Sequence, residues 1–197
     1  MLKAKTHVSC RVCKNPYQAW SAAQQLNRFC GPVCASEWGR MKNDERRHKA
    51  NKADTRKRRE ALKTKGDWTK EAQSALNSYI RERDHALPCM ACGEFYGGNA
   101  LTGGGYDAGH YRSRGSAPAM RFHLLNIWRV CTRCNRELSG NIVEMRKNMV
   151  LRLGEDRVQG IEHDNRSPRY SVDDLKRIKR IFSRRAKQFR KRREARV

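Results

Sequence analysis

Eight cysteines arranged as four close pairs constrain this 197-residue chain more than any other feature. The pairs are Cys10/Cys13, Cys30/Cys34, Cys89/Cys92 and Cys131/Cys134. Gaps of two or three residues let both thiolates of a pair face one tetrahedral ion, which is the pattern of structural zinc. The sequence therefore predicts two four-cysteine zinc sites, one from the first four cysteines and one from the last four. Disulfides or free thiols are the alternative, but repeated close pairs in so lysine-rich a chain favour zinc and a reduced, cytoplasmic compartment.

The charge balance indicates a polyanionic partner. The chain holds 44 Lys and Arg against 20 Asp and Glu, a formal net charge of +24, and its hydrophobic fraction is 38%. So little apolar surface predicts one or two small domains with long basic helices. No run of residues is apolar enough to span a membrane, and the first residues lack the apolar core of a secretory signal. A polyanionic partner would relieve the self-repulsion of this charge, and nucleic acid is the leading candidate.

The N-terminal third divides into two expected segments. Residues 1–38 hold the first four cysteines, so we expect an N-terminal four-cysteine zinc finger there. Because so short a segment buries little apolar surface, its folding must depend on the metal. Residues 39–66 predict a basic helical linker, since positions 40–65 carry twelve Lys or Arg and four acids, with no Pro and no Gly. Such a helix either lies along phosphates or is a solvated, flexible connection.

For the rest of the chain, the sequence predicts a zinc-stapled domain over residues 67–170 and a basic C-terminal helix over residues 171–197. Gly66 is expected to break the linker helix and Asp67 to cap the next one, which would end near His85. The apolar stripe of that helix is Trp68, Ala72, Leu76, Tyr79 and Ile80. A polar stretch around 155–169 precedes the C-terminal helix.

The C-terminal helix has its own start signal and apolar side. Ser171 and Asp174 form a capping-box pattern. The apolar side is Leu175, Ile178, Ile181, Phe182 and Phe189. Residues 172–197 carry a net charge of +9, and 40–65 carry +8. Concentration of charge in two helices favours phosphate binding over general solubility.

The second set of cysteines encloses the residues that could carry chemistry. Cys92 and Cys131 are separated by 38 residues, too many for a minimal zinc ribbon, so the metal would staple the base of an inserted structure. The insert contains Tyr-Asp-Ala-Gly-His-Tyr at 106–111, two arginines at 112 and 114, and an asparagine at 126, and Asn135 follows the last cysteine.

This arrangement resembles the zinc-bound HNH (ββα-metal) nuclease family. The shared features are a knuckle, a strand ending in Asp-x-x-His, and asparagines at 126 and 135, nine residues apart. With its N-terminal finger, the run DAGHYRSRG and the basic tail, the whole chain is similar to the NinG (Rap) recombination nucleases of lambdoid phages. The resemblance implies an α+β fold: a zinc-stapled, treble-clef-like HNH core with an N-terminal four-cysteine finger and long basic helices.

The resemblance also implies the catalytic residues. His110 matches the general base of the family, and a neutral imidazole with a pKa near 6.5 can accept a proton from water at cellular pH. Asn126 matches the central asparagine, which holds the catalytic loop and the histidine in position. His110 as an ordinary loop histidine is the alternative.

The cation of such a site would be held by oxygen. Asp107 is the carboxylate near His110, and Asn135 stands where many members place a histidine ligand. Gly109 stands where the family commonly has a His or Asp ligand. Both departures favour oxygen-bound Mg²⁺ or Mn²⁺ over a nitrogen-bound transition metal. Asp107 as a residue that caps its own turn is the alternative.

Arg112 and Arg114 follow the base closely and are expected to clamp the DNA phosphate, with ordinary surface arginines as the alternative. The resemblance implies a metal-dependent, structure-selective DNA endonuclease acting on Holliday junctions and D-loops during phage recombination in the host cytoplasm. Cutting both strands of a junction would need two sites, hence a homodimer or paired loading of two chains, and recombination proteins could recruit it. The competing hypothesis is a non-catalytic, zinc-containing protein that binds branched DNA through a degenerate site.

Overall fold

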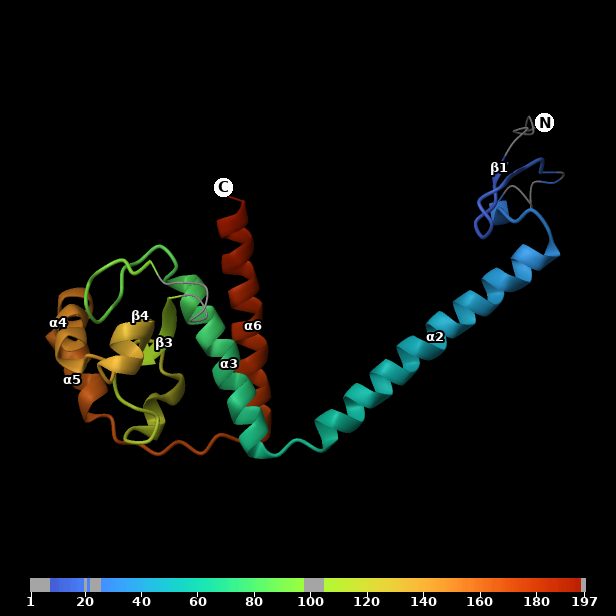
Figure 1. The fold of residues 1–197 in the computed structure, drawn as a ribbon. Helices are drawn as coiled ribbons and strands as arrows, with labels where there is room; N and C mark the ends of the chain where they lie inside the picture. The colour runs from blue at the N-terminus through green and yellow to red at the C-terminus, as the bar shows by residue number, and fades with distance from the viewer. Residues whose placement is uncertain (1–7, 20, 22–25, 98–104, 196–197) are drawn as a thin grey trace. The chain divides into compact units, whose positions relative to one another are not determined.

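The computed structural model describes residues 8–19, 21, 26–97 and 105–195, and the statements below refer to these (Figure 1). The fold combines helices with two small sheets. It divides into two compact units, Met1–Leu62 and Lys63–Val197. None of the helices within the described ranges is both long enough and apolar enough to cross a membrane.

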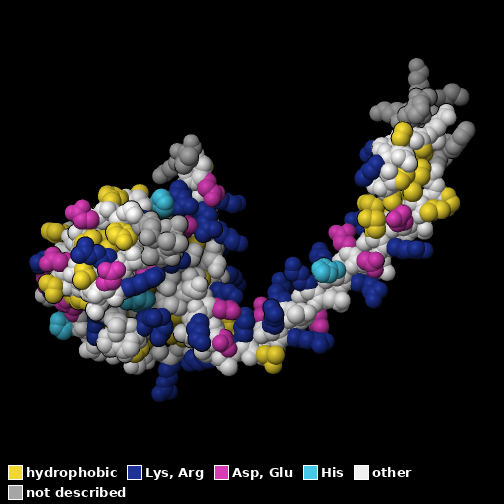
Figure 2. Space-filling view, in the orientation of Figure 1, with side chains coloured by type: hydrophobic (Ala, Val, Ile, Leu, Met, Phe, Trp, Pro, Cys, Tyr) yellow, Lys and Arg dark blue, Asp and Glu magenta, His cyan; other side chains and the backbone are white. Residues whose placement is uncertain are grey.

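The first unit is a small knuckle followed by a long exposed helix. Strand β1 (Val8–Ser9) pairs antiparallel with β2 (Pro16–Tyr17). Helix α2 (Pro32–Ala61) has proline in its first turn, where the missing N–H costs no hydrogen bond. It buries none of its residues, and Lys and Arg side chains cover much of the face shown in Figure 2. A helix that is polar all round has no core to join.

Helix α3 (Lys65–Arg83) begins earlier than the sequence indicated. Thr64 is its N-cap, because its hydroxyl accepts from the amide of Asp67 at 3.2 Å and the Asp67 carboxylate accepts from the amide of Thr64 at 3.0 Å. The expectation that Gly66 breaks the helix and Asp67 caps it was therefore wrong: Gly66 lies in the first turn, and Asp67 is the third residue of a capping box. All five stripe residues are buried, as predicted.

The C-terminal helix α6 (Val172–Glu194) packs along α3 (Figure 1). Its predicted capping box is present, with the Ser171 hydroxyl accepting from the Asp174 amide at 3.1 Å. Leu175 and Phe182 are buried against α3. Lys179 pairs with Glu71 across the two helices at 2.8 Å.

The middle of the chain forms a hairpin. Strand β3 (Tyr106–His110) pairs antiparallel with β4 (Ile127–Cys131), so that Tyr106 faces Cys131 and His110 faces Ile127. The connection contains a 3-10 turn, η2 (Pro118–Phe122), and β4 leads into a π-helical turn, η3 (Arg133–Glu137).

A buried carboxylate joins this hairpin to the end of α3. Asp84, 3% exposed, accepts from the Arg83 side chain at 2.6 Å and from the Arg129 backbone at 3.2 Å. Because an unpaired charge at this depth would be costly, the contacts fix the hairpin relative to α3.

Two further helices cover the hairpin. Helix α4 spans Ile142–Leu153 and α5 spans Glu155–His163. The polar stretch that the sequence showed from 155 thus begins as a helix, whose two buried side chains, Val158 and Ile161, complete the core.

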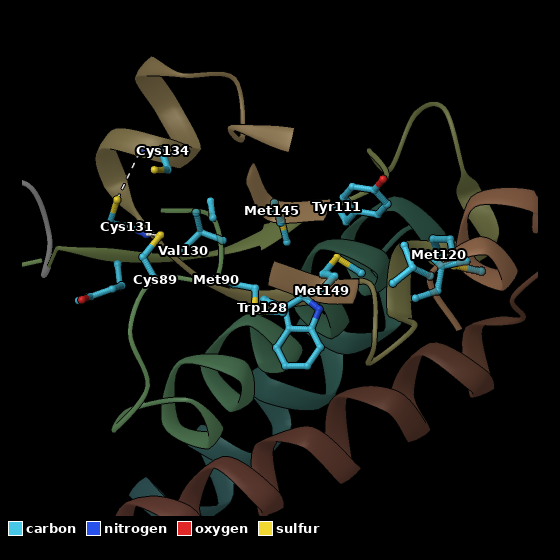
Figure 3. Close-up of a cluster of buried hydrophobic side chains, with 14 of the residues drawn as sticks. Cys89, Met90, Tyr111, Met120, Trp128, Val130, Cys131, Cys134, Met145 and Met149 are labelled. Carbon is cyan, nitrogen blue, oxygen red and sulfur yellow. Dashed lines mark hydrogen bonds between the residues drawn. The ribbon is translucent and has the colours of Figure 1, made fainter. Parts of the chain in front are cut away.

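The second cysteine cluster is part of the largest core. Cys89, Cys131 and Cys134 lie at one end of it in Figure 3, and Met120 lies at the other. Met145 and Met149 of α4 pack between these ends. Three of the four thiols of the second cluster are therefore part of the core itself.

Candidate functional site

The eight cysteines gather into two groups that could each hold a metal ion, as predicted. Within each group the four sulfur atoms lie within 4.8 Å of one another. In the first group, the Sγ atoms of Cys30 and Cys34 are 3.4 Å apart. Four thiolates about 2.3 Å from a tetrahedral zinc would have their sulfurs about 3.8 Å apart, so both groups need only small adjustments to bind it.

Backbone amides favour the thiolate form of Cys89. In the second group, the Cys131 amide donates to the sulfur of Cys89 at 3.2 Å. Burial raises the pKa of Cys89, but this and other backbone N–H donors outweigh it and lower the pKa overall. Because the thiolate is the zinc ligand, these donors favour the binding form.

The second cysteine cluster lies at one end of the β3–β4 hairpin, and His110 lies at the other end of β3. Cys131 ends β4 opposite Tyr106, and Cys134 lies in η3. His110 is at the far end of β3 and lines a pocket of about 470 Å³ with residues from the following loop, η3–α4 and α5. The other lining residues are Tyr111, Arg112, Ser113, Ser116, Ser139, Ile142 and Glu162.

The imidazole of His110 is held neutral. Burial is the largest cause that lowers its pKa to about 4, and the nearby guanidinium groups of Arg114 and Arg121 lower it further. Its Nε2 lies 3.2 Å from the carbonyl oxygen of Arg121. A carbonyl oxygen only accepts, so Nε2 carries the proton in this contact and Nδ1 keeps the free lone pair.

Asn126 fixes the loop that follows His110. Its side chain is fully buried, its oxygen accepts from the Arg112 amide at 2.8 Å, and its Nδ2 donates to the carbonyls of Arg112 and Met120, each at 3.1 Å. One amide therefore binds both ends of the loop between β3 and η2, which makes Asn126 a positioning residue.

Asp107 and Asn135 lie together, separate from the imidazole. The Asn135 Nδ2 donates to Asp107 Oδ2 at 2.9 Å. Asp107 and His110 are three positions apart on one strand, so their side chains leave opposite faces of it. A Cβ on Gly109 would approach Val130 Cγ2 at 2.8 Å and the Asn135 oxygen at 3.1 Å, so a side chain at 109 would crowd both groups.

The two predicted phosphate contacts differ in their surroundings. The Arg112 guanidinium donates to the carbonyls of Ile161 and Asp164 at 3.0 and 2.8 Å and to the Asn165 side chain at 2.7 Å. Its donors thus fasten the end of α5. Arg114 is exposed on the loop.

Two features of the site escaped the sequence analysis. Arg136 pairs with Asp107, its Nε donating to Oδ2 at 2.9 Å and its Nη2 to Oδ1 at 3.1 Å. Tyr111 donates to Glu162 at 2.5 Å, and Arg146 donates to the same carboxylate at 2.8 Å. The position of Arg136 next to Asn135 was a usable signal, whereas nothing in the sequence links Tyr111 to a glutamate 51 residues away.

Comparison with known proteins places the chain among phage proteins. A family model described as Bacteriophage Lambda NinG protein matches residues 2–194. The protein named Protein ninG of Escherichia phage lambda is 35% identical, with 91% of this chain and 93% of the relative covered. Its namesake from Salmonella phage P22 is 36% identical, with 91% and 94% covered. No solved structure matches the chain significantly.

Proposed function

The chain belongs to the bacteriophage Lambda NinG family, and from this premise we propose that it is a metal-dependent DNA endonuclease of the HNH type. The observation that carries the proposal is the neutral imidazole of His110, which lines a pocket and keeps Nδ1 free. An antiparallel hairpin followed by a helical turn, with a four-cysteine group at its base, also supports the proposal.

His110 would act as the general base. Its Nδ1 accepts a proton from the attacking water, while Nε2 keeps its hydrogen bond to the Arg121 carbonyl and so holds the ring in one orientation. That carbonyl also stabilises the positive charge that the ring gains. Asn126 keeps the loop, and hence this carbonyl, in place through its contacts with Arg112 and Met120.

Asp107 and Asn135 fit a hard divalent cation. A carboxylate and an amide oxygen are suitable ligands for Mg²⁺ or Mn²⁺, which bind few protein groups and complete their coordination with water and phosphate oxygens. A cation bound there would stabilise negative charge on the phosphate and on the leaving oxygen. A side chain at position 109 would crowd the amide oxygen of Asn135, which glycine avoids.

We propose DNA as the substrate because of the charge on two exposed helical surfaces. Helix α2 buries none of its residues, and α6 presents Arg180, Arg184, Lys187 and Lys191 on the side opposite its buried residues. The resemblance adds four further parts to the proposal. The enzyme would select branched recombination intermediates and act as a homodimer with two cutting sites. It would be recruited by recombination proteins and act in the host cytoplasm.

The pH dependence of cleavage should reflect the low pKa of His110. A histidine with its ordinary pKa near 6.5 would lose about 90% of its base form between pH 7.5 and 5.5, whereas a pKa of about 4 leaves more than about 90% of it at pH 5.5. Single-turnover cleavage rates should therefore change less than about twofold over this range. A roughly tenfold fall with both zinc ions retained would contradict the low pKa.

The exposed face of α6 should set the salt dependence of DNA binding. Truncation after Val172 would remove Leu175 and Phe182 from the core, so substitution of the four exposed basic residues by Gln is the better test. If each contacts one phosphate, the slope of log affinity against log salt falls by about 3 to 4. Fluorescence anisotropy measures it, and an unchanged slope in a variant with unchanged melting temperature would remove α6 from the interface.

A nuclease assay tests the proposal itself. Zinc-loaded protein is incubated with an end-labelled four-way junction and a linear duplex, with EDTA, Mg²⁺ or Mn²⁺. We expect nicking with either divalent ion, none with EDTA, and faster cutting of the junction. Tight junction binding without cutting under every condition would favour the non-catalytic alternative. The ion pair between Arg136 and Asp107 favours that alternative, because it occupies the carboxylate that would bind the cation.

A further inference from the structure

Asp107 is fully engaged before any divalent cation arrives. Arg136 contacts both carboxylate oxygens, at 2.9 and 3.1 Å, and Asn135 adds a third donor at 2.9 Å. This is the bidentate geometry in which guanidinium and carboxylate bind most strongly. A cation at Asp107 would lie within a few ångströms of a guanidinium, and the two positive charges repel each other. Cation binding therefore requires Arg136 to leave the carboxylate.

Arg136 is able to leave. Its side chain is 57% exposed, whereas that of Asp107 is 24% exposed. It projects from η3, a single helical turn, so a change of side-chain rotamer releases it without moving the backbone. The released guanidinium, whose planar fork matches a phosphate, stays beside the cation ligands.

Arg136 is also placed to supply a phosphate contact beside the proposed cation ligands. Arg112, which the sequence indicated for this role, uses its guanidinium to fasten α5. Arg136 is next in sequence to Asn135, so it adjoins the proposed cation site directly.

We propose that Arg136 is a built-in counter-ion of Asp107, which exchanges the carboxylate for a DNA phosphate when a divalent cation binds. The inference rests on the proposed function, because it takes Asp107 as a cation ligand. It makes cation and DNA binding cooperative: the cation frees Arg136 for the phosphate, and the phosphate keeps Arg136 from returning. The free protein accordingly binds the cation weakly.

The first test measures Mn²⁺ binding without DNA. Zinc-loaded protein is titrated with Mn²⁺, and free Mn²⁺ is followed by electron paramagnetic resonance. Arg136→Gln should bind Mn²⁺ about three- to tenfold more tightly than wild type, since a competing cation is gone. Arg133→Gln, three positions earlier in the same turn and exposed, is the matched control and should match wild type. Asp107→Asn should lose this binding.

The second test measures the coupling in a His110→Ala background, so that DNA stays intact. Anisotropy gives DNA affinity with EDTA and with Ca²⁺. Ca²⁺ should strengthen DNA binding by the His110→Ala protein, and equally when Arg133→Gln is added as the control. When Arg136→Gln is added instead, Ca²⁺ should no longer strengthen DNA binding. Equal Mn²⁺ affinity for Arg136→Gln and wild type would overturn the exchange alone. Absence of Mn²⁺ binding in every variant, with both zinc ions present, would overturn the cation site of the proposed function together with the exchange.

Discussion

Replacing Cys131 by serine should remove one zinc ion and unfold the second unit. Cys131 is 1% exposed, ends β4 and lies within the largest core cluster. Its sulfur accepts from the Cys134 amide at 3.4 Å. A structural zinc supplies about 10–16 kcal/mol in small zinc-dependent folds, which exceeds the stability of most domains of this size. Elemental analysis should give one zinc per chain instead of two, and near-ultraviolet circular dichroism should lose its tertiary signal.

Cys10→Ser is the matched control. Cys10 is equally buried but belongs to the first unit, where no helix of the second unit's core is involved. It should also lose one zinc ion while the second unit keeps its cooperative unfolding transition. Two zinc ions in Cys131→Ser, or collapse of both variants to zero, would show that the four-cysteine groups are not two independent metal sites.

Replacing His110 by alanine should abolish cleavage and preserve DNA binding. Loss of a positioned general base costs about 10²–10⁴-fold in rate. Binding should change little, because an imidazole with a pKa of about 4 is neutral at pH 7 and attracts no phosphate. Single-turnover nicking of a labelled junction with Mg²⁺, with anisotropy in EDTA, measures both quantities.

His85→Ala controls for loss of a histidine elsewhere in the second unit. His85 is exposed at the end of α3, so the variant should cut and bind as wild type does. Cutting that survives in His110→Ala would assign the base to another group. If the wild-type protein also failed to cut, the result would support the competing hypothesis of a non-catalytic protein that binds branched DNA.

The sequence predicted those parts of the fold that depend on local spacing. Two cysteines with two or three residues between them readily face one centre, and the two groups form as expected. Ser171 and Asp174 cap α6 because a capping box needs only a four-residue pattern. The stripe of α3 is buried because 3.6-residue periodicity places it on one side.

The remaining features depend on contacts that a single sequence does not contain. Helix α3 starts earlier than expected because the hydroxyl of Thr64 accepts a hydrogen bond from the amide of Asp67. Helix α5 has only two buried side chains, and the core that buries them comes from α4 and the hairpin. Arg112 and Arg136 differ in role because one meets the carbonyls at the end of α5 and the other meets Asp107.

The most direct measurement is anomalous scattering from a crystal soaked in Mn²⁺. It asks whether the oxygen ligands on the β3–η3 surface accept a divalent cation. We expect a peak bonded to Asp107 and Asn135, two separate zinc peaks at the cysteine groups, and an Arg136 side chain turned away from Asp107. Two zinc peaks with no manganese beside Asp107, and Arg136 still paired with it, would contradict the hydrolytic site.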